Sequence, residues 1–153
     1  SVRFPGIISY GALPGGGTTD YAVEVFYHAK SEHKYNCEVP EDSYMDMIYM
    51  PDALEATTQL MEADPAKLRH RNSFNIASMS FTPEQIFAEI RKRIPDFTHK
   101  YNIDPVKAKI AASWPDCMDD SAAREEWGWN PKWDLSKMVD DMLLHVDPKK
   151  LNL

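Results

Sequence analysis

Hydrophobic residues recur along the chain with the spacings of short strands and amphipathic helices. The apolar run over residues 2–8 predicts a buried strand that bends at Pro5-Gly6. A glycine-rich loop follows over residues 11–17, and Thr18-Thr19-Asp20 then offers N-cap chemistry for a helix. That helix is predicted by four apolar residues spaced i, i+3, i+4 and i+7: Ala22, Val25, Phe26 and Ala29.

Strands and helices alternate through the rest of the chain, which predicts an α/β fold. Short strands are predicted over residues 35–39, 45–50, 73–76 and 97–101. Helices are predicted over residues 51–61, 83–94, 106–112, 121–127 and 135–143. The polar tail after Pro148 is expected to fray.

The clearest helix start in the sequence lies at Thr82. Thr82 can cap the helix, Pro83 suits its first position, and Gln85 completes a capping box. Phe81 and Ile86 stand where a hydrophobic staple would pack.

Length, composition and charge limit the class of protein. The chain has 153 residues, 43% of them hydrophobic and 27% charged, which fits one globular domain. The formal charge of −7 argues against binding nucleic acid or an anionic membrane surface. No apolar run approaches the roughly 20 residues that a membrane helix needs. Cys37 and Cys117 lack paired spacing and are interpreted as free thiols in a reducing compartment.

The glycine-rich loop ahead of a helix resembles a phosphate site only in part. Helix N-termini bind anions, but a P-loop needs a lysine after its last glycine, and none follows Gly17. The dinucleotide pattern G-x-G-x-x-G also fails, because position 20 is Asp. The segment is therefore either a flexible loop or a lid whose hydroxyls hold a small polar ligand.

Other kinds of site receive little support. The five histidines lack metal-ligand spacing, so no metal site is predicted, and neither cysteine has a local histidine partner for nucleophilic catalysis. The acidic segments at Glu41-Asp42 and over residues 116–120 are interpreted as solvated loops. Core packing is the expected role of the four tryptophans, Trp114, Trp127, Trp129 and Trp133.

The chain opens at Ser1 inside an apolar, strand-like run, with no initiator methionine and no signal peptide. A strand there leaves unpaired edges. It is therefore interpreted either as an unusual N-terminal edge strand or as the start of the C-terminal part of a longer protein.

Several segments together resemble a known family. Residues 1–9 (SVRFPGIIS) and 14–22 (PGGGTTDYA) are similar to the mitochondrial-type L-threonine 3-dehydrogenases, which are epimerase-like members of the extended short-chain dehydrogenase/reductase family. Residues 47–53 and 73–84 fit the same pattern, and residues 120–131 resemble the closing motif of the superfamily. The resemblance runs from residue 1 to about residue 145.

The resemblance implies a particular division of the molecule. Residues 1–12 would be a late strand of a Rossmann sheet, and residues 13–153 mainly the small substrate-binding lobe with returning Rossmann elements. Family members are about twice as long, and their first half carries the nucleotide loop and a catalytic Tyr-x-x-x-Lys pair. No tyrosine here has a lysine four residues on. The chain thus resembles the C-terminal half, with no catalytic residue of its own, and is expected to be inactive alone.

The family reaction oxidises L-threonine at its β-carbon with NAD⁺ and gives 2-amino-3-ketobutyrate, a step of threonine catabolism. The resemblance implies three cofactor contacts: Pro5, Gly6 and Ile7. It also implies three residues that face the amino acid: Thr18, Thr19 and Asp20. Asp20 would either meet the substrate ammonium group or act only as an acid at the helix start.

The resemblance further implies L-threonine and the missing N-terminal half as partners, a homodimer in the full-length enzyme, and a mitochondrial location. A sugar-nucleotide epimerase or dehydratase is the alternative enzyme. Its diphosphate substrate calls for Arg or Lys, and residues 35–60 contain neither. A non-catalytic binding module is the third interpretation. It fits the missing Tyr-Lys pair, but it would leave a sheet edge exposed.

Overall fold

Strand β4 (Met45–Tyr49) lies at the centre of the molecule and is buried at every residue. In the computed structural model, which describes residues 1–153, β2 (Gly6–Ile8) pairs with β4 in parallel and β6 (Met79–Phe81) pairs with it antiparallel. The order β2-β4-β6 leaves one edge of β2 without a partner strand.

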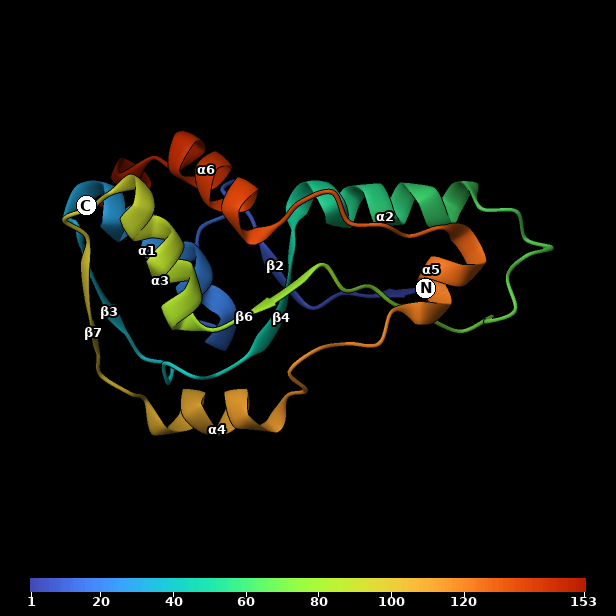
Figure 1. Cartoon of the computed structure of the whole chain (residues 1–153), viewed down its shortest axis with the longest axis horizontal. Helices are drawn as coiled ribbons and strands as arrows, with labels where there is room; N and C mark the ends of the chain where they lie inside the picture. Colours follow the sequence, from blue (N-terminus) through green and yellow to red (C-terminus); the bar gives the residue numbers. More distant parts are fainter.

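Two shorter parallel pairs complete the strands. β1 (Val2–Arg3) pairs with β5 (Phe74–Asn75), and β3 (Lys34–Cys37) pairs with β7 (Thr98–Tyr101). Figure 1 places the β3–β7 pair toward the end of the long axis that holds the C-terminus, and the N-terminal strand toward the other end. The molecule is therefore elongated, with β4 between its two ends.

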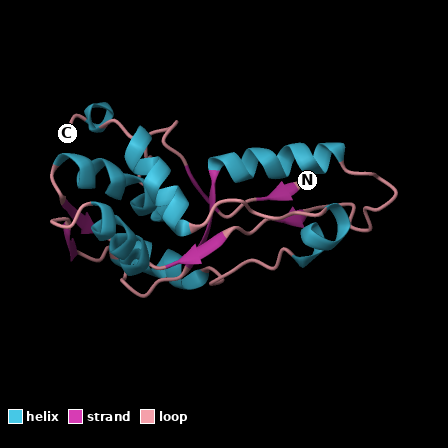
Figure 2. Cartoon of the chain, turned by 45° about the horizontal axis from the view of Figure 1, so that its top comes forward, coloured by secondary structure: helices cyan, strands magenta, loops and turns pink.

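Six α-helices surround these strands: α1 (Tyr21–Ser31), α2 (Met50–Glu62), α3 (Pro83–Arg93), α4 (Pro105–Ser113), α5 (Ser121–Trp127) and α6 (Leu135–His145). Two 3₁₀ turns, η1 (Thr18–Asp20) and η2 (Pro148–Leu151), precede α1 and close the chain. Most helices crowd at the C-terminal end in Figure 2, whereas α2 and α5 flank the strands at the N-terminal end. None of the helices is both long and apolar enough to cross a membrane.

The helices and strands enclose two separate cores. The larger cluster has 24 buried residues and draws on α1, α3 and α6, and the smaller has 7 and lies among α2, β5 and α5. Side chains alternate along a strand, so β4 contributes to both: Met47 and Tyr49 enter the larger core, and Ile48 enters the smaller one. β4 therefore joins the two parts of the molecule.

The predicted α/β class and the predicted helices are confirmed, with small shifts at their ends. At α3 the backbone N–H of Gln85 donates to Thr82 Oγ1 at 3.3 Å, and the N–H of Thr82 donates to Gln85 Oε1 at 2.9 Å. The capping box read from the sequence is thus present. Gly128 ends α5 with φ +78°, a conformation that favours glycine.

One strand was missed, and two sequence expectations are wrong. β6 is a strand that was not predicted, because its pairing depends on β4 rather than on a local pattern. The tail forms η2, with Leu151 packed on the larger core, so it does not fray. Trp114 is 42% exposed, whereas the other tryptophans pack against the cores.

Buried carboxylates hold the long connection between α4 and α6 in place. The N–H groups of Lys132 and Trp133 donate to Asp52 at 3.0 and 3.1 Å, and the N–H of Met118 donates to Asp46 at 2.8 Å. Both acceptors are buried and lie in α2 and β4. Charged acceptors make strong bonds to backbone amides, so this irregular segment has a fixed path.

Asp46 gives a testable pH dependence. Burial raises its pKa, which the amide of Met118 only partly offsets. The pKa of Asp46 is therefore higher in the folded chain than in the unfolded chain. At neutral pH, where both forms are ionised, this difference lowers the free energy of unfolding. We expect Asp46→Asn, which keeps an oxygen for the Met118 amide, to be more stable than the parent in urea at neutral pH. The advantage should shrink as the pH falls toward the ordinary aspartate pKa, and a variant less stable at neutral pH would contradict this.

Candidate functional site

The glycine-rich loop is closed by the side chain of Asp20. Its Oδ2 atom accepts hydrogen bonds from the N–H groups of Gly15 at 2.6 Å and Gly17 at 2.9 Å. η1 begins directly after Gly17, and α1 continues from it without a break. The expected helix start is present, with the carboxylate rather than a threonine hydroxyl holding the loop. Only one carboxylate oxygen is used in these bonds, which leaves Oδ1 for another donor.

Gly6 lies where no side chain fits. A Cβ atom at this position would come within 2.5 Å of Met47 Sδ and 2.8 Å of Thr19 Cγ2. The glycine therefore allows β2 to pack closely on η1 and β4. One candidate cofactor residue and one candidate substrate residue are thereby brought into contact.

A hollow of about 220 Å³ lies beside this contact. Ile7, 40% exposed, and Asp20 both line it. The remaining lining residues are Ser9, Ala12, Leu13, Pro14, Val23 and Met50. Of the six candidates, only Ile7 and Asp20 line the hollow. Gly6 and Thr19 contact each other beside it, whereas Pro5 lies outside the lining and Thr18 is buried.

The side chains that line the hollow limit which part of a dinucleotide could bind there. Five of its eight lining residues are hydrophobic, and none is Arg or Lys. Such a surface fits a flat, apolar ring against Ile7 and an ammonium group at Asp20, but it offers no cation for a diphosphate. This chain could therefore supply one wall of a nicotinamide site and no phosphate-binding part.

A contact that the sequence analysis missed anchors the loop over the hollow. The ring of Tyr10 stacks on His145 of α6, with centroids 4.7 Å apart. His145 Nδ1 lies 3.2 Å from Asp141 Oδ1, and Tyr49 donates its hydroxyl proton to Asp141 Oδ2 at 2.5 Å. Burial and this hydrogen bond raise the pKa of Tyr49, which therefore stays a donor. The i, i+4 spacing of Asp141 and His145 was visible in the sequence, but their distant partner Tyr10 was not.

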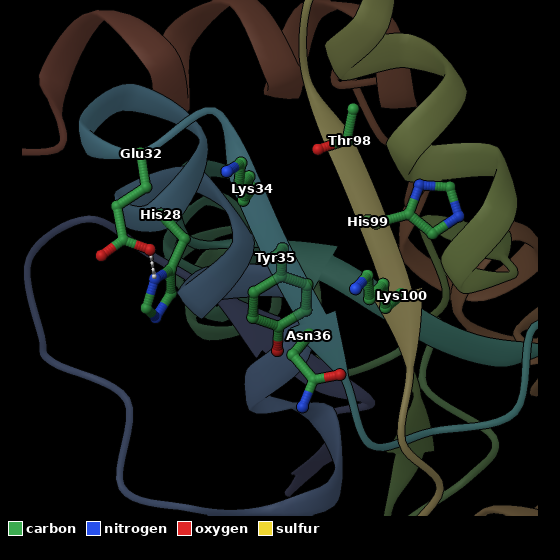
Figure 3. A pocket seen from close by; sticks show the side chains of 8 residues that line it. All are labelled: His28, Glu32, Lys34, Tyr35, Asn36, Thr98, His99 and Lys100. Carbon is green, nitrogen blue, oxygen red and sulfur yellow. Dashed lines mark ion pairs between the residues drawn. The ribbon is translucent and has the colours of Figure 1, made fainter.

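A larger hollow, of about 400 Å³, lies elsewhere, between the end of α1 and the β3–β7 pair (Figure 3). Its two histidines and its tyrosine already have partners within the chain. His28 lies 3.6 Å from Glu32, His99 Nε2 lies 3.1 Å from Glu84, and the Tyr35 hydroxyl donates to Glu24 at 3.0 Å. It contains none of the candidate residues, so it is a less suitable site. In the whole chain, no three His, Cys, Asp or Glu side chains are grouped as metal ligands would be.

Comparisons with known proteins identify the enzymes that this chain resembles. No family model matches the chain. An L-threonine dehydrogenase structure from Clostridium difficile is 51% identical, with a TM-score of 0.93, over 97% of this chain and 46% of that one. The Phytophthora infestans enzyme is 48% identical, with a TM-score of 0.91, over 100% of this chain and 48% of its own. The chain resembles the C-terminal half of an L-threonine 3-dehydrogenase.

The curated relatives point to the same superfamily under a broader name. An uncharacterised epimerase/dehydratase of Staphylococcus haemolyticus is 53% identical over 152 residues. The chain spans 48% of that relative, or about half the length of the curated proteins it matches. The epimerase-like short-chain dehydrogenase/reductase fold is also seen at low identity, 14% with a TM-score of 0.67, in a heptose epimerase structure from Helicobacter pylori.

The expected mitochondrial location is wrong. It was carried over from eukaryotic members of the family that the sequence resembles. The relatives found here include proteins of Staphylococcus and Clostridium, and bacteria have no mitochondria. Similarity of fold to these relatives therefore does not indicate where in a cell this protein is located.

The packing at Gly6 predicts a steric cost. Gly6→Ala should lower the free energy of unfolding by about 1–3 kcal/mol, because the new methyl group overlaps Met47 and Thr19. Gly15→Ala is the matched control, because its Cβ would meet nothing closer than Asp20 Oδ2 at 3.9 Å. Urea unfolding of both variants measures the difference, and equal stability would show that β2 and η1 are not tightly packed.

The stacking of Tyr10 on His145 predicts a loss of stability when the ring is removed. Aromatic pairs are worth roughly 0.5–1.5 kcal/mol, so His145→Ala should lower the free energy of unfolding in urea by about that amount. His145→Phe keeps a ring for Tyr10 and should unfold nearly as the parent does. Equal stability of all three proteins would show that the contact does not hold the loop.

Proposed function

We propose that this chain is the substrate-side half of an NAD-dependent L-threonine 3-dehydrogenase, which oxidises L-threonine to 2-amino-3-ketobutyrate. The observation that carries the proposal is the likeness to L-threonine dehydrogenase structures, near 50% identity over almost the whole chain. The hollow between Ile7 and Asp20 supports it, because it pairs an apolar wall with a carboxylate.

The proposed roles follow from what each group can do. Ile7 provides an apolar surface for the nicotinamide ring, and NAD⁺ accepts the hydride when bound. Asp20 Oδ1 accepts from the threonine ammonium group while Oδ2 keeps the loop closed. Thr18 and Thr19 form the turn that holds Asp20 in place, and Pro5-Gly6 set the path of the strand. The group that removes the hydroxyl proton belongs to the other half, as do the phosphate contacts.

The two cores support a matching division of the chain. Residues 1–12, together with α2, β5 and α5 around the smaller core, are proposed as the end of the Rossmann sheet and its returning elements. The larger core around α1, α3 and α6 is proposed as the substrate lobe. The unpaired edge of β2 would then receive the NAD-binding half, and two such enzymes would form the dimer expected for the family.

A sugar-nucleotide epimerase or dehydratase is the second candidate, because the curated relatives carry the name epimerase/dehydratase. A diphosphate substrate needs cationic side chains, and the hollow has none. A non-catalytic module is the third possibility, and it predicts no reaction with either substrate.

The test uses this chain joined to the N-terminal half of the Clostridium difficile enzyme, with NAD⁺ and L-threonine. We expect threonine-dependent NADH formation. Asp20→Asn keeps an oxygen for the Gly15 and Gly17 amides but removes the charge, so the KM for threonine should rise by about tenfold or more with the KM for NAD⁺ little changed. The matched control, Glu32→Gln, changes a charge at the far end of α1 and should leave both constants unchanged.

Two results would count against this account. The absence of NADH formation from threonine, with turnover of a nucleotide sugar instead, would favour the epimerase or dehydratase. Unchanged kinetic constants in Asp20→Asn would remove this residue from the threonine site.

A further inference from the structure

Helix α4 carries an apolar stripe on the outside of the molecule. Four large apolar residues are exposed along this segment: Ile103 just before the helix, Val106 and Ile110 within it, and Trp114 directly after it. They are 41%, 64%, 38% and 42% exposed, respectively. Figure 1 shows α4 set apart along one side of the molecule, between β7 and α5.

The helix is mostly apolar and mostly exposed. Six of its nine residues are apolar, the others being Lys107, Lys109 and Ser113, and Ala111 is its only buried residue. A row of neighbouring apolar side chains on a surface typically marks an interaction site.

The stripe is held in a fixed position. Asp104 caps the helix by accepting from the N–H of Val106 at 2.7 Å, and its own N–H donates to the Glu38 carbonyl at 2.9 Å. Lys107, on the same side of the helix as Ile110, forms an ion pair through Nζ with the Glu38 carboxylate at 2.6 Å. These contacts tie α4 to the segment after β3, so the outward direction of the stripe is a property of the fold.

The stripe also adjoins the candidate site. α4 packs against η1, the turn that contains Thr18, Thr19 and Asp20. Any partner that brings a cofactor to Ile7 and a base to the bound threonine must come close to η1. Because α4 contacts η1, such a partner would also lie close to α4.

We propose that the α4 stripe is a docking surface for the NAD-binding half of the enzyme, an inference that rests on the proposed function. The chain spans only 46–48% of the dehydrogenase structures cited above, so about half of such an enzyme is available to cover the stripe. The two halves then meet at two places, the free edge of β2 and α4, with the substrate hollow between them. A second copy of this chain is the competing occupant.

The test measures how accessible α4 is to a thiol reagent. In a Cys117→Ser background, whose remaining Cys37 is buried, Val106→Cys reports on the stripe and Leu144→Cys on an exposed site of α6. Each is labelled in the chain alone and in the chain joined to the N-terminal half of the Clostridium difficile enzyme. We expect Val106→Cys to react at least about tenfold more slowly in the joined protein, and Leu144→Cys to react equally in both.

Two other outcomes would overturn the docking surface, and a third would separate it from the proposed reaction. Equal labelling of Val106→Cys in both proteins would show that the catalytic half does not cover α4. Protection in the chain alone that grows with concentration would assign the stripe to a second copy. Protection in a joined protein that does not oxidise threonine would uphold the surface and reject the proposed reaction, so the two failures can be told apart.

Discussion

The close packing of Gly6 against Thr19 and Met47 is the contact on which the candidate site depends. It sets β2 against the turn that starts α1, and it does so because glycine leaves no side chain between them. Met47 comes from β4, the buried strand that joins both cores. The position of the hollow beside Ile7 and Asp20 therefore follows from the central strand order.

Around that contact, polar groups fix the parts of the chain that have no regular structure. Asp20 closes the glycine-rich loop by accepting from its amides, and Asp46 and Asp52 do the same for the connection to α6. Tyr10 and His145 join the first loop to the last helix. Irregular backbone must find partners for its N–H groups, and here carboxylates on buried elements provide them. The wall of the hollow is thus built from loops with defined positions.

Local patterns in the sequence predicted most of the fold. The capping box at Thr82 and the terminal Gly128 act through residues a few positions apart, so their helices could be placed in advance. β6 forms only by pairing with β4, and Tyr10 contacts a residue of α6. Both contacts join distant parts of the chain, so no local sequence pattern indicates them. The helix-forming sequence around Val106 gave no sign that α4 would stand outside the core. The resemblance identified Ile7 and Asp20, but only the structure showed that they line one hollow, and that Gly6 faces Thr19 and Met47.

The most direct test of the account is to locate bound threonine. The chain joined to the NAD-binding half is loaded with NADH, which cannot accept a hydride, and is titrated with L-threonine while chemical-shift changes are followed by NMR on the labelled chain. The account predicts that the largest changes cluster at Ile7 and over residues 18–20, beside the hollow. Changes confined to the other hollow, around His28 and Lys100, would contradict it.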